Sequence, residues 1–247
     1  MDEKTSLKYQ LISAWCGPAF VVLFVLFWMH IGGNFPGPSP AFDTAQLTSR
    51  YLDNLDDMRL GFVVSLVVIT LYMPWTALLS AQMARIEGRY PVLAFLQLIG
   101  GGLTVMVVSF SAFFWVAALF RPDRDPALFQ LLNDLGWLCI ETQYACTTLQ
   151  MAAAALAGLS DRSKVPLFPR WMCFLTIWCG LSFIPASLTG YFKTGPFAWD
   201  GMLSFYIPYA CWLVWFSAAS YFMIREVHRR MHAADLAAPA GSMAYGA

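Results

Sequence analysis

Residues 92–120 have the sequence VLAFLQLIGGGLTVMVVSFSAFFWVAALF and contain no charged side chain. A helix of about 20 apolar residues is long enough to cross the hydrocarbon core of a bilayer, so this stretch can span one. The whole chain has the same character, because 59% of its residues are hydrophobic and 12% are charged. About a quarter of the residues of a soluble domain are charged. The sequence therefore predicts a membrane protein and excludes both a soluble domain and a disordered chain.

Five other apolar stretches lie along the chain. Four of them are free of charge, and the fifth, residues 128–158, contains Asp134 and Glu141. The alternation of apolar and polar residues that is typical of a transmembrane β-barrel is absent. We therefore expect an all-α, polytopic transmembrane helix bundle of about six spans, at residues 12–30, 61–83, 92–120, 128–158, 171–191 and 202–224.

Lysine and arginine are unevenly divided between the two sides of such a bundle. With a cytoplasmic N-terminus, 10 of these residues fall on the cytoplasmic side and 5 on the other, which is the bias that cytoplasmic loops carry. We therefore expect both termini to be cytoplasmic. The first apolar stretch lacks a small-residue cleavage site, so we expect it to be a span and not a signal peptide. The expected organisation is a cytoplasmic N-terminus at 1–11, a single transmembrane bundle at 12–230 and a disordered cytoplasmic tail at 231–247.

The longest connection between spans follows the first one. Several prolines open it, and Asp43 is placed to cap a helix after them. Apolar residues then recur at every fourth position, at Leu47, Tyr51 and Leu55. This spacing predicts an amphipathic segment at about 43–57 that lies against the outer rim of the bundle. It acts either as a packing lid or as a gate over a cavity.

Asp134 and Glu141 are the two ionisable residues inside the expected spans, and such groups are costly in a membrane and commonly functional. Seven positions apart, they share one face of a helix and are separated by about 10 Å along its axis. Glu141 is expected near the midplane, where burial favours a neutral acid that donates a hydrogen bond or a proton. The residues that we expect to bind a ligand are Glu141, Asp134, Tyr144, Thr148, Tyr72 and Thr76.

A purely structural interpretation of the same residues stays open. Hydroxyl groups on other spans, including those of Tyr206 and Tyr209, are placed to hydrogen-bond the two carboxyl groups across helix interfaces. In that case Asp134 and Glu141 would hold the bundle together without binding anything.

The chain lacks the usual signatures of metal, cofactor and nucleic-acid sites. All six cysteines fall inside expected spans, so we expect no disulfide framework. The three histidines lie at the ends of spans and cannot supply the facing pair that a bis-histidine haem requires. The balance of 15 basic and 15 acidic residues excludes a basic nucleic-acid footprint. The expected partners are the lipid bilayer and a small lipophilic ligand, with the oligomeric state left open.

Four short motifs carry a resemblance to known sequences. They are RPDRDP at 121–126, NDLGWL at 133–138, FPRW at 168–171 and FKTGPFAWDG at 192–201. With these motifs, the chain from about 50 to 225 is similar to a group of bacterial six-helix polytopic membrane proteins. The resemblance implies a recurring helical unit in a bacterial cytoplasmic (inner) membrane, and it supplies neither a substrate nor catalytic residues. We also expect residues 193–201 to form an outer hairpin, where Lys193 or Asp200 pairs with Asp134.

These features leave three functions open. The first is a protein that binds or transports a small lipophilic molecule through a cavity containing the Glu141 carboxyl group. The second is a membrane-embedded enzyme of the isomerase or cyclase type, with Glu141 or Asp134 as a general acid toward a terpenoid or sterol-like substrate. The third is an accessory subunit of a larger membrane complex.

Overall fold

The computed structural model describes residues 2–237, and every regular element in that range is helical. The α-helices are α1 (Glu3–Phe24), α2 (Thr44–Leu52), α3 (Leu55–Val68), α4 (Tyr72–Glu87), α5 (Val92–Phe120), α6 (Pro126–Thr142), α7 (Ala145–Ser160), α8 (Arg170–Ser182) and α9 (Ile207–Ala237). Two π-helical segments, η1 (Val25–Ile31) and η4 (Met202–Tyr206), and two 3-10 segments, η2 (Ile69–Leu71) and η3 (Ile184–Leu188), extend or join them.

Five continuous helical segments in the described part of the chain are long and apolar enough to cross a membrane. They overlap five of the six expected spans and indicate a multi-pass membrane protein. The segments are Glu3–Ile31, Leu55–Glu87, Val92–Phe120, Arg170–Leu188 and Met202–Leu236.

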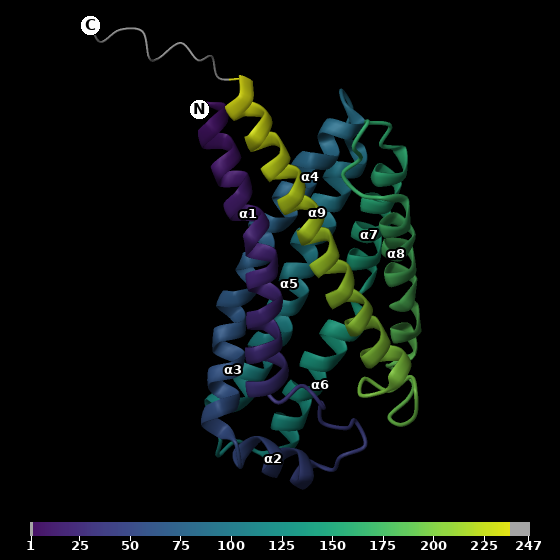
Figure 1. The fold of residues 1–247 in the computed structure, drawn as a ribbon. Coiled ribbons are helices and arrows are strands. Elements are labelled where there is room, and N and C mark those ends of the chain that lie inside the picture. Colours follow the sequence, from purple (N-terminus) through teal and green to yellow (C-terminus); the bar gives the residue numbers. More distant parts are fainter. Residues whose placement is uncertain (1, 238–247) are drawn as a thin grey trace, which may run out of the picture.

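The sixth expected span, 128–158, is not one helix. It is divided into α6 and α7, with Gln143 and Tyr144 between them, and neither half is long enough to cross a bilayer by itself. The two halves follow one another beside α5, and the first turn of α1 and the last turn of α9 lie at the same end of the bundle, opposite α2 (Figure 1).

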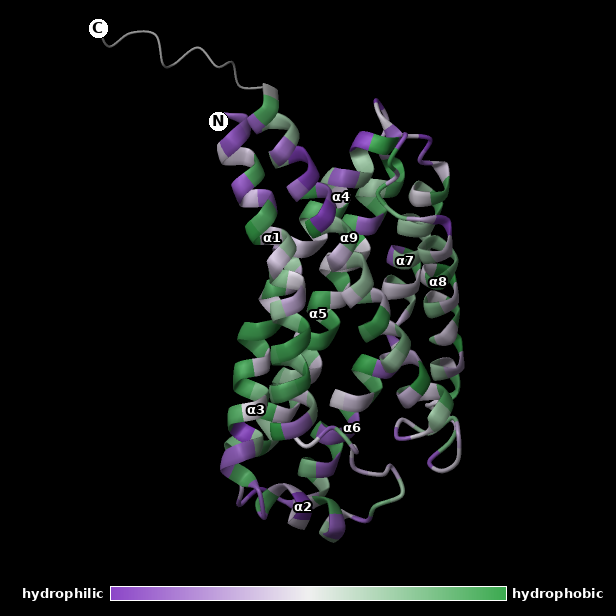
Figure 2. Cartoon of the chain, viewed as in Figure 1, coloured by the Kyte–Doolittle hydropathy of each residue, from purple (hydrophilic) through white to green (hydrophobic). Residues whose placement is uncertain are grey.

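The bundle has large aromatic side chains in its core and many apolar side chains on its outer surface. Trp28, Trp75 and Trp115 are fully buried in the core, whereas Val22 is 65% exposed and Val67 is 69% exposed on the outside of their helices. Figure 2 shows hydrophobic residues concentrated at mid-height and hydrophilic ones toward the two ends. An apolar outer surface of this kind suits a lipid surrounding, because lipid tails are as apolar as the side chains they contact.

The amphipathic segment after the first span forms as α2. The Asp43 side chain accepts a hydrogen bond from the backbone N–H of Gln46, and the Gln46 side chain accepts one from the backbone N–H of Asp43, which together form a capping box. Leu47 and Tyr51 are buried against the bundle. The helix ends at Leu52 instead of 57, so Leu55 begins the next helix. The helix and its cap are therefore confirmed, and its end is corrected.

The two ends of the chain are more helical than expected. α1 begins at Glu3, inside the expected N-terminal segment 1–11, and α9 continues to Ala237. Residues 231–237 of the expected disordered tail are therefore helical, whereas 238–247 lie outside the described residues. The two helices are joined near their ends by Lys4 Nζ to Asp235 Oδ1 at 3.2 Å, and by Arg230 Nη1 to Gln10 Oε1 at 2.9 Å.

Candidate functional site

Glu141 lies in the last turn of α6 and points into the bundle. Its side chain is 2% exposed, and its Oε1 accepts a hydrogen bond of 3.1 Å from the hydroxyl group of Tyr209 on α9. Among residues 2–237, no lysine, arginine or histidine nitrogen lies within 4.0 Å of this carboxyl group. An isolated ionised carboxylate is costly in such surroundings. The site therefore suits the neutral acid.

Glu226 shows the contrast. It is 8% exposed on α9, but both of its oxygens accept hydrogen bonds of 2.8 Å from the guanidinium group of Arg229. A second cationic group, that of Arg85, lies 3.9 Å from Glu226 Oε1. Of these two buried glutamates, Glu141 is the one held by a neutral partner.

The α6–α7 break directly follows Glu141. Gln143 has φ −90° and ψ 16°, which ends the helix, and its freed carbonyl group accepts a hydrogen bond of 3.1 Å from the thiol of Cys146. The hydroxyl group of Thr142 bonds back to the carbonyl group of Leu138 at 2.6 Å. Side chains of this kind re-satisfy backbone groups where a transmembrane helix is interrupted.

An aromatic cluster surrounds Tyr209. Its ring stacks on Trp28 at a centroid distance of 5.8 Å and contacts Phe205 at 4.5 Å. Trp137, one turn before Glu141 on α6, lies 6.2 Å from Trp28. Trp28 and Phe205 belong to the π-helical segments η1 and η4, which widen α1 and α9 on either side of the tyrosine. Both segments lie at helix ends, with η1 following α1 and η4 preceding α9.

A small cavity adjoins this cluster at the helix break. It measures about 40 Å³, and Thr104, Tyr144, Thr147 and Tyr209 are among its lining residues. The hydroxyl groups of Thr104 and Thr147 are 2.8 Å apart. A water molecule takes about 30 Å³ of the liquid, and pockets for organic ligands measure about 300–1,000 Å³. The cavity thus has room for water but not, in this conformation, for a lipophilic ligand.

The other residues expected to bind a ligand are only partly gathered here. Tyr144 lines the cavity, but its hydroxyl group bonds to that of Ser187 at 2.5 Å. Thr148 turns to α8, where it donates a hydrogen bond of 3.0 Å to the carbonyl group of Gly180. Asp134 is half-buried nearer the α2 end of α6 and accepts a bond of 3.3 Å from Asn133.

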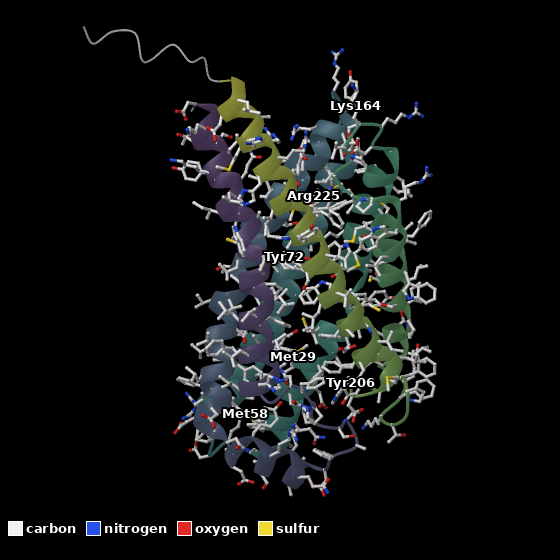
Figure 3. The ribbon with its side chains drawn as sticks, in the orientation of Figure 1. Met29, Met58, Tyr72, Lys164, Tyr206 and Arg225 are labelled. Atoms are coloured by element: carbon white, nitrogen blue, oxygen red, sulfur yellow. The ribbon has the colours of Figure 1, made fainter. Side chains whose placement is uncertain are left out.

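Tyr72 and Thr76 belong to a separate polar cluster, which lies at mid-height in the bundle, where Figure 3 labels Tyr72. Tyr72 donates a hydrogen bond of 2.9 Å to Gln150 Oε1. Thr76 Oγ1 accepts bonds from Gln97 at 2.8 Å and from Gln150 at 3.4 Å, and Ser80 bonds to Gln97. Gln97 and Gln150 are fully buried. This cluster fastens α4 to α5 and α7, and neither Tyr72 nor Thr76 bonds to Glu141.

The expected ion pair at the outer hairpin does not form. Residues 191–201 make a loop of turns, but neither Lys193 nor Asp200 takes part in an ion pair within 4.0 Å in the described part of the chain. The loop is instead attached through the indole N–H of Trp199, which donates a hydrogen bond of 2.8 Å to the carbonyl group of Pro38.

Two contributors to the Glu141 site were not selected from the sequence as ligand-binding residues. The sequence predicts Tyr209 only as a structural partner of a carboxyl group and predicts no role for Trp28. Both lie on spans distant in sequence, and apolar or aromatic residues are so frequent in every span that no pattern distinguishes them. The detectable signal was the polar run Glu141–Thr142–Gln143 inside an apolar stretch.

Replacing Tyr209 with phenylalanine tests the hydrogen bond to Glu141. Removing the hydroxyl group leaves the buried carboxyl group without its donor, so we expect a loss of about 1–3 kcal/mol in the free energy of unfolding. The measurement is unfolding in detergent followed by tryptophan fluorescence. Tyr221→Phe, on the same helix, is the control because Tyr221 is 63% exposed. Equal stability of the two variants would contradict the expected role of the bond.

The five long apolar helices and the buried polar groups between them define an all-helical, multi-pass membrane protein. No protein-family model, curated protein or solved structure matches this chain.

Proposed function

We propose that this protein binds or carries a small lipophilic molecule across the membrane, and that Glu141 exchanges a proton during the cycle. The supporting observation is the placement of Glu141, a buried carboxyl group with one neutral hydrogen-bond donor and no cation within 4.0 Å in the described chain. A carboxyl group held in this way changes charge when it changes partner, which is what proton coupling requires. Aromatic walls beside it would bind the apolar part of a ligand.

The cavity of about 40 Å³ corresponds, in this proposal, to a closed state. Opening would use the places where helices are already irregular, namely the α6–α7 break and the segments η1 and η4. Discontinuous helices near the midplane are a recurring feature of transporters, since they move as two halves around a fixed site. Tyr144 lines the cavity at the break, so its bond to Ser187 would be among the first to change.

The membrane topology that accompanies this proposal has six crossings, with α6 and α7 together as the fourth. Both termini lie in the cytoplasm of a bacterium, on the side that carries more lysine and arginine. Support comes from the start of α1 and the end of α9, which lie at one end of the bundle (Figure 1), because two ends on the same side require an even number of crossings.

Replacing Glu141 with glutamine tests the proton coupling. Proteoliposomes with an imposed pH gradient are given a labelled lipophilic cation, tetraphenylphosphonium, or a labelled neutral isoprenoid alcohol, geraniol. We expect gradient-dependent uptake of one of these probes by the natural protein and about a tenfold or greater loss of it with Glu141→Gln, because the amide cannot exchange a proton.

Asp123→Asn is the matched control, since Asp123 is an exposed carboxylate in the loop before α6. It should leave uptake unchanged. Uptake that is identical in Glu141→Gln across the pH range would refute proton coupling through this residue. If the natural protein moves neither probe, the carrier proposal loses its support.

A role as an accessory subunit is the second candidate, and the tight packing around Glu141 favours it. The carboxyl group has a hydrogen-bond partner, and the adjoining space is water-sized. Under this alternative, the protein purified in a mild detergent should retain a partner at fixed stoichiometry, and Glu141→Gln should alter only stability. The small cavity gives no support to the enzyme alternative, because a terpenoid or sterol does not fit beside the proposed acid.

A further inference from the structure

A second cavity lies at the end of the bundle that carries both termini, far from Glu141 along the helix axes. It measures about 430 Å³, is open on one side, and is lined by the end of α4, the loop after α7 and part of α9. Lys164, labelled in Figure 3, marks the position of that loop at the terminal end of the bundle. Hydrophilic residues are concentrated at the same end in Figure 2.

The cavity is lined by more positive than negative side chains. The guanidinium groups of Arg85, Arg162 and Arg229 line it together with the carboxyl groups of Glu226 and Asp161. Glu226 is already neutralised by its two 2.8 Å bonds from Arg229. Arg85 makes only a long contact of 3.9 Å to Glu226, and Arg162 forms no ion pair or side-chain hydrogen bond within residues 2–237. The guanidinium groups of Arg85 and Arg162 therefore have N–H donors that are not used in hydrogen bonds within the described residues.

Asp161 is held by its own loop and does not neutralise these arginines. Its two carboxylate oxygens accept hydrogen bonds of 2.9 Å from the backbone N–H groups of Ser163 and Leu167. Partial burial raises the pKa of Asp161, but these hydrogen bonds outweigh it and lower the pKa below its ordinary value. The carboxylate thus shapes the loop that presents Arg162.

Gln82 provides an independent sign of a missing occupant. It lies on α4, lines the cavity and is 3% exposed. Neither the nitrogen nor the oxygen of its side-chain amide has a hydrogen-bond partner in the described part of the chain. Buried amide groups in native proteins are almost always paired, and this one lies in the wall of the cavity without a partner.

We propose that this cavity binds a phosphate group, with Arg85 and Arg162 pairing its charge and the Gln82 amide hydrogen-bonding it. Guanidinium groups bind phosphate through parallel, charge-assisted hydrogen bonds. The phosphate belongs either to the head group of an anionic phospholipid, which basic pockets between transmembrane helices recognise, or to a free phosphate or phosphate ester. The site is independent of the proposed carrier function and of Glu141.

The experiment has two arms that separate these sources. In the first, the full-length protein in detergent is titrated with inorganic phosphate against sodium chloride at equal ionic strength. In the second, it is placed in nanodiscs of phosphatidylcholine with or without phosphatidylglycerol. The readout in both arms is the midpoint of thermal unfolding, because a ligand that binds the folded state raises it.

Arg162→Ala and Gln82→Leu are the test variants, and Arg89→Ala is the control. Arg89 is exposed at the same end of the bundle but does not line the cavity. We expect each test variant to require an about tenfold or greater concentration of the phosphate source for the same rise in the unfolding midpoint. Arg89→Ala should leave that concentration unchanged. Arg162 lies in an exposed loop, so its variant is informative even if Gln82→Leu impairs folding.

A response to inorganic phosphate in detergent that Arg162→Ala removes would support a small phosphate compound as the occupant. A response that requires phosphatidylglycerol and is removed by the same variant would support a lipid head group. The proposal is overturned if neither phosphate source raises the midpoint, or if Arg162→Ala and Arg89→Ala reduce the response equally.

Discussion

Replacing Gly61 with leucine should prevent the bundle from folding. Gly61 lies on α3 where it meets the end of η1, and a β-carbon at this position would overlap the backbone of Gly32 and the carbonyl oxygen of Phe27. Backbone atoms cannot rotate away as a flexible side chain can, so the two helices would have to separate along their whole contact. We expect a loss of about 4 kcal/mol or more in the free energy of unfolding, or no folded protein.

Gly102→Leu is the matched control for this prediction. Gly102 lies in the triple-glycine run of α5, and a β-carbon there meets no atom within 4 Å. The free energy of unfolding of this variant should lie within about 0.5 kcal/mol of that of the natural protein. Thermal unfolding in detergent, combined with size-exclusion chromatography, distinguishes the two. A monodisperse Gly61→Leu protein with unchanged stability would show that α3 and η1 do not pack as described.

Replacing Gln150 with leucine is the second large effect that we expect. Gln150 is fully buried, accepts the hydrogen bond from Tyr72 and donates to Thr76. Leucine fills a similar volume but leaves the Tyr72 hydroxyl group buried without an acceptor. The expected cost is about 2–3 kcal/mol in the free energy of unfolding, because an orphaned buried polar group loses its full hydration.

A double variant separates the hydrogen bond from packing. Removing both partners with Tyr72→Phe and Gln150→Leu leaves no orphaned hydroxyl group at Tyr72, so the double variant should be more stable than Gln150→Leu alone. The measurement is the free energy of unfolding for all four proteins of the cycle. If the losses in unfolding free energy of the two single variants add up to that of the double variant, the hydrogen bond contributes nothing. The cluster would then be stabilised by side-chain packing alone.

The positions of the long helices could be predicted from the sequence because charge and hydropathy determine them directly. Residues 92–120 contain no charge, and α5 occupies the same residues. The capping residue Asp43 was also recognisable, since a capping box depends on local side-chain chemistry. These features follow from short-range physics and need no knowledge of the partners of a helix.

The break within the expected span 128–158 was not predicted. The polar run Glu141–Thr142–Gln143 interrupts the apolar stretch 128–158, but neither proline nor glycine marks the break at Gln143 and Tyr144. The helix ends there because polar side chains bond to the backbone and because the two halves have different neighbours: both pack against α5, but α6 also packs against α2 and α7 against α8. The second of these causes consists of contacts between helices that are distant in the sequence, so the sequence pattern alone does not reveal it.

The candidate site was predicted in part. Glu141 is buried as expected and Tyr209 bonds to it, but Tyr72 and Thr76 bond to glutamines instead. The helical spacing places residues on a face without fixing which neighbouring helix that face meets. The role of these residues in binding a ligand stays a prediction.

The hydrogen bond between Tyr209 and Glu141 joins positions 68 residues apart, which has a consequence during synthesis. The ribosome completes α6 before α8 and α9 have emerged, so Glu141 enters the bilayer while its donor has not yet been made. Until α9 has been inserted, the Glu141 carboxyl group of the nascent chain lacks its hydrogen-bond donor, and the face of α1 that packs against α9 stays uncovered. Insertion of the last helix therefore supplies both at once, and a chain stopped before residue 207 would present quality-control proteases with the polar group that the finished protein conceals.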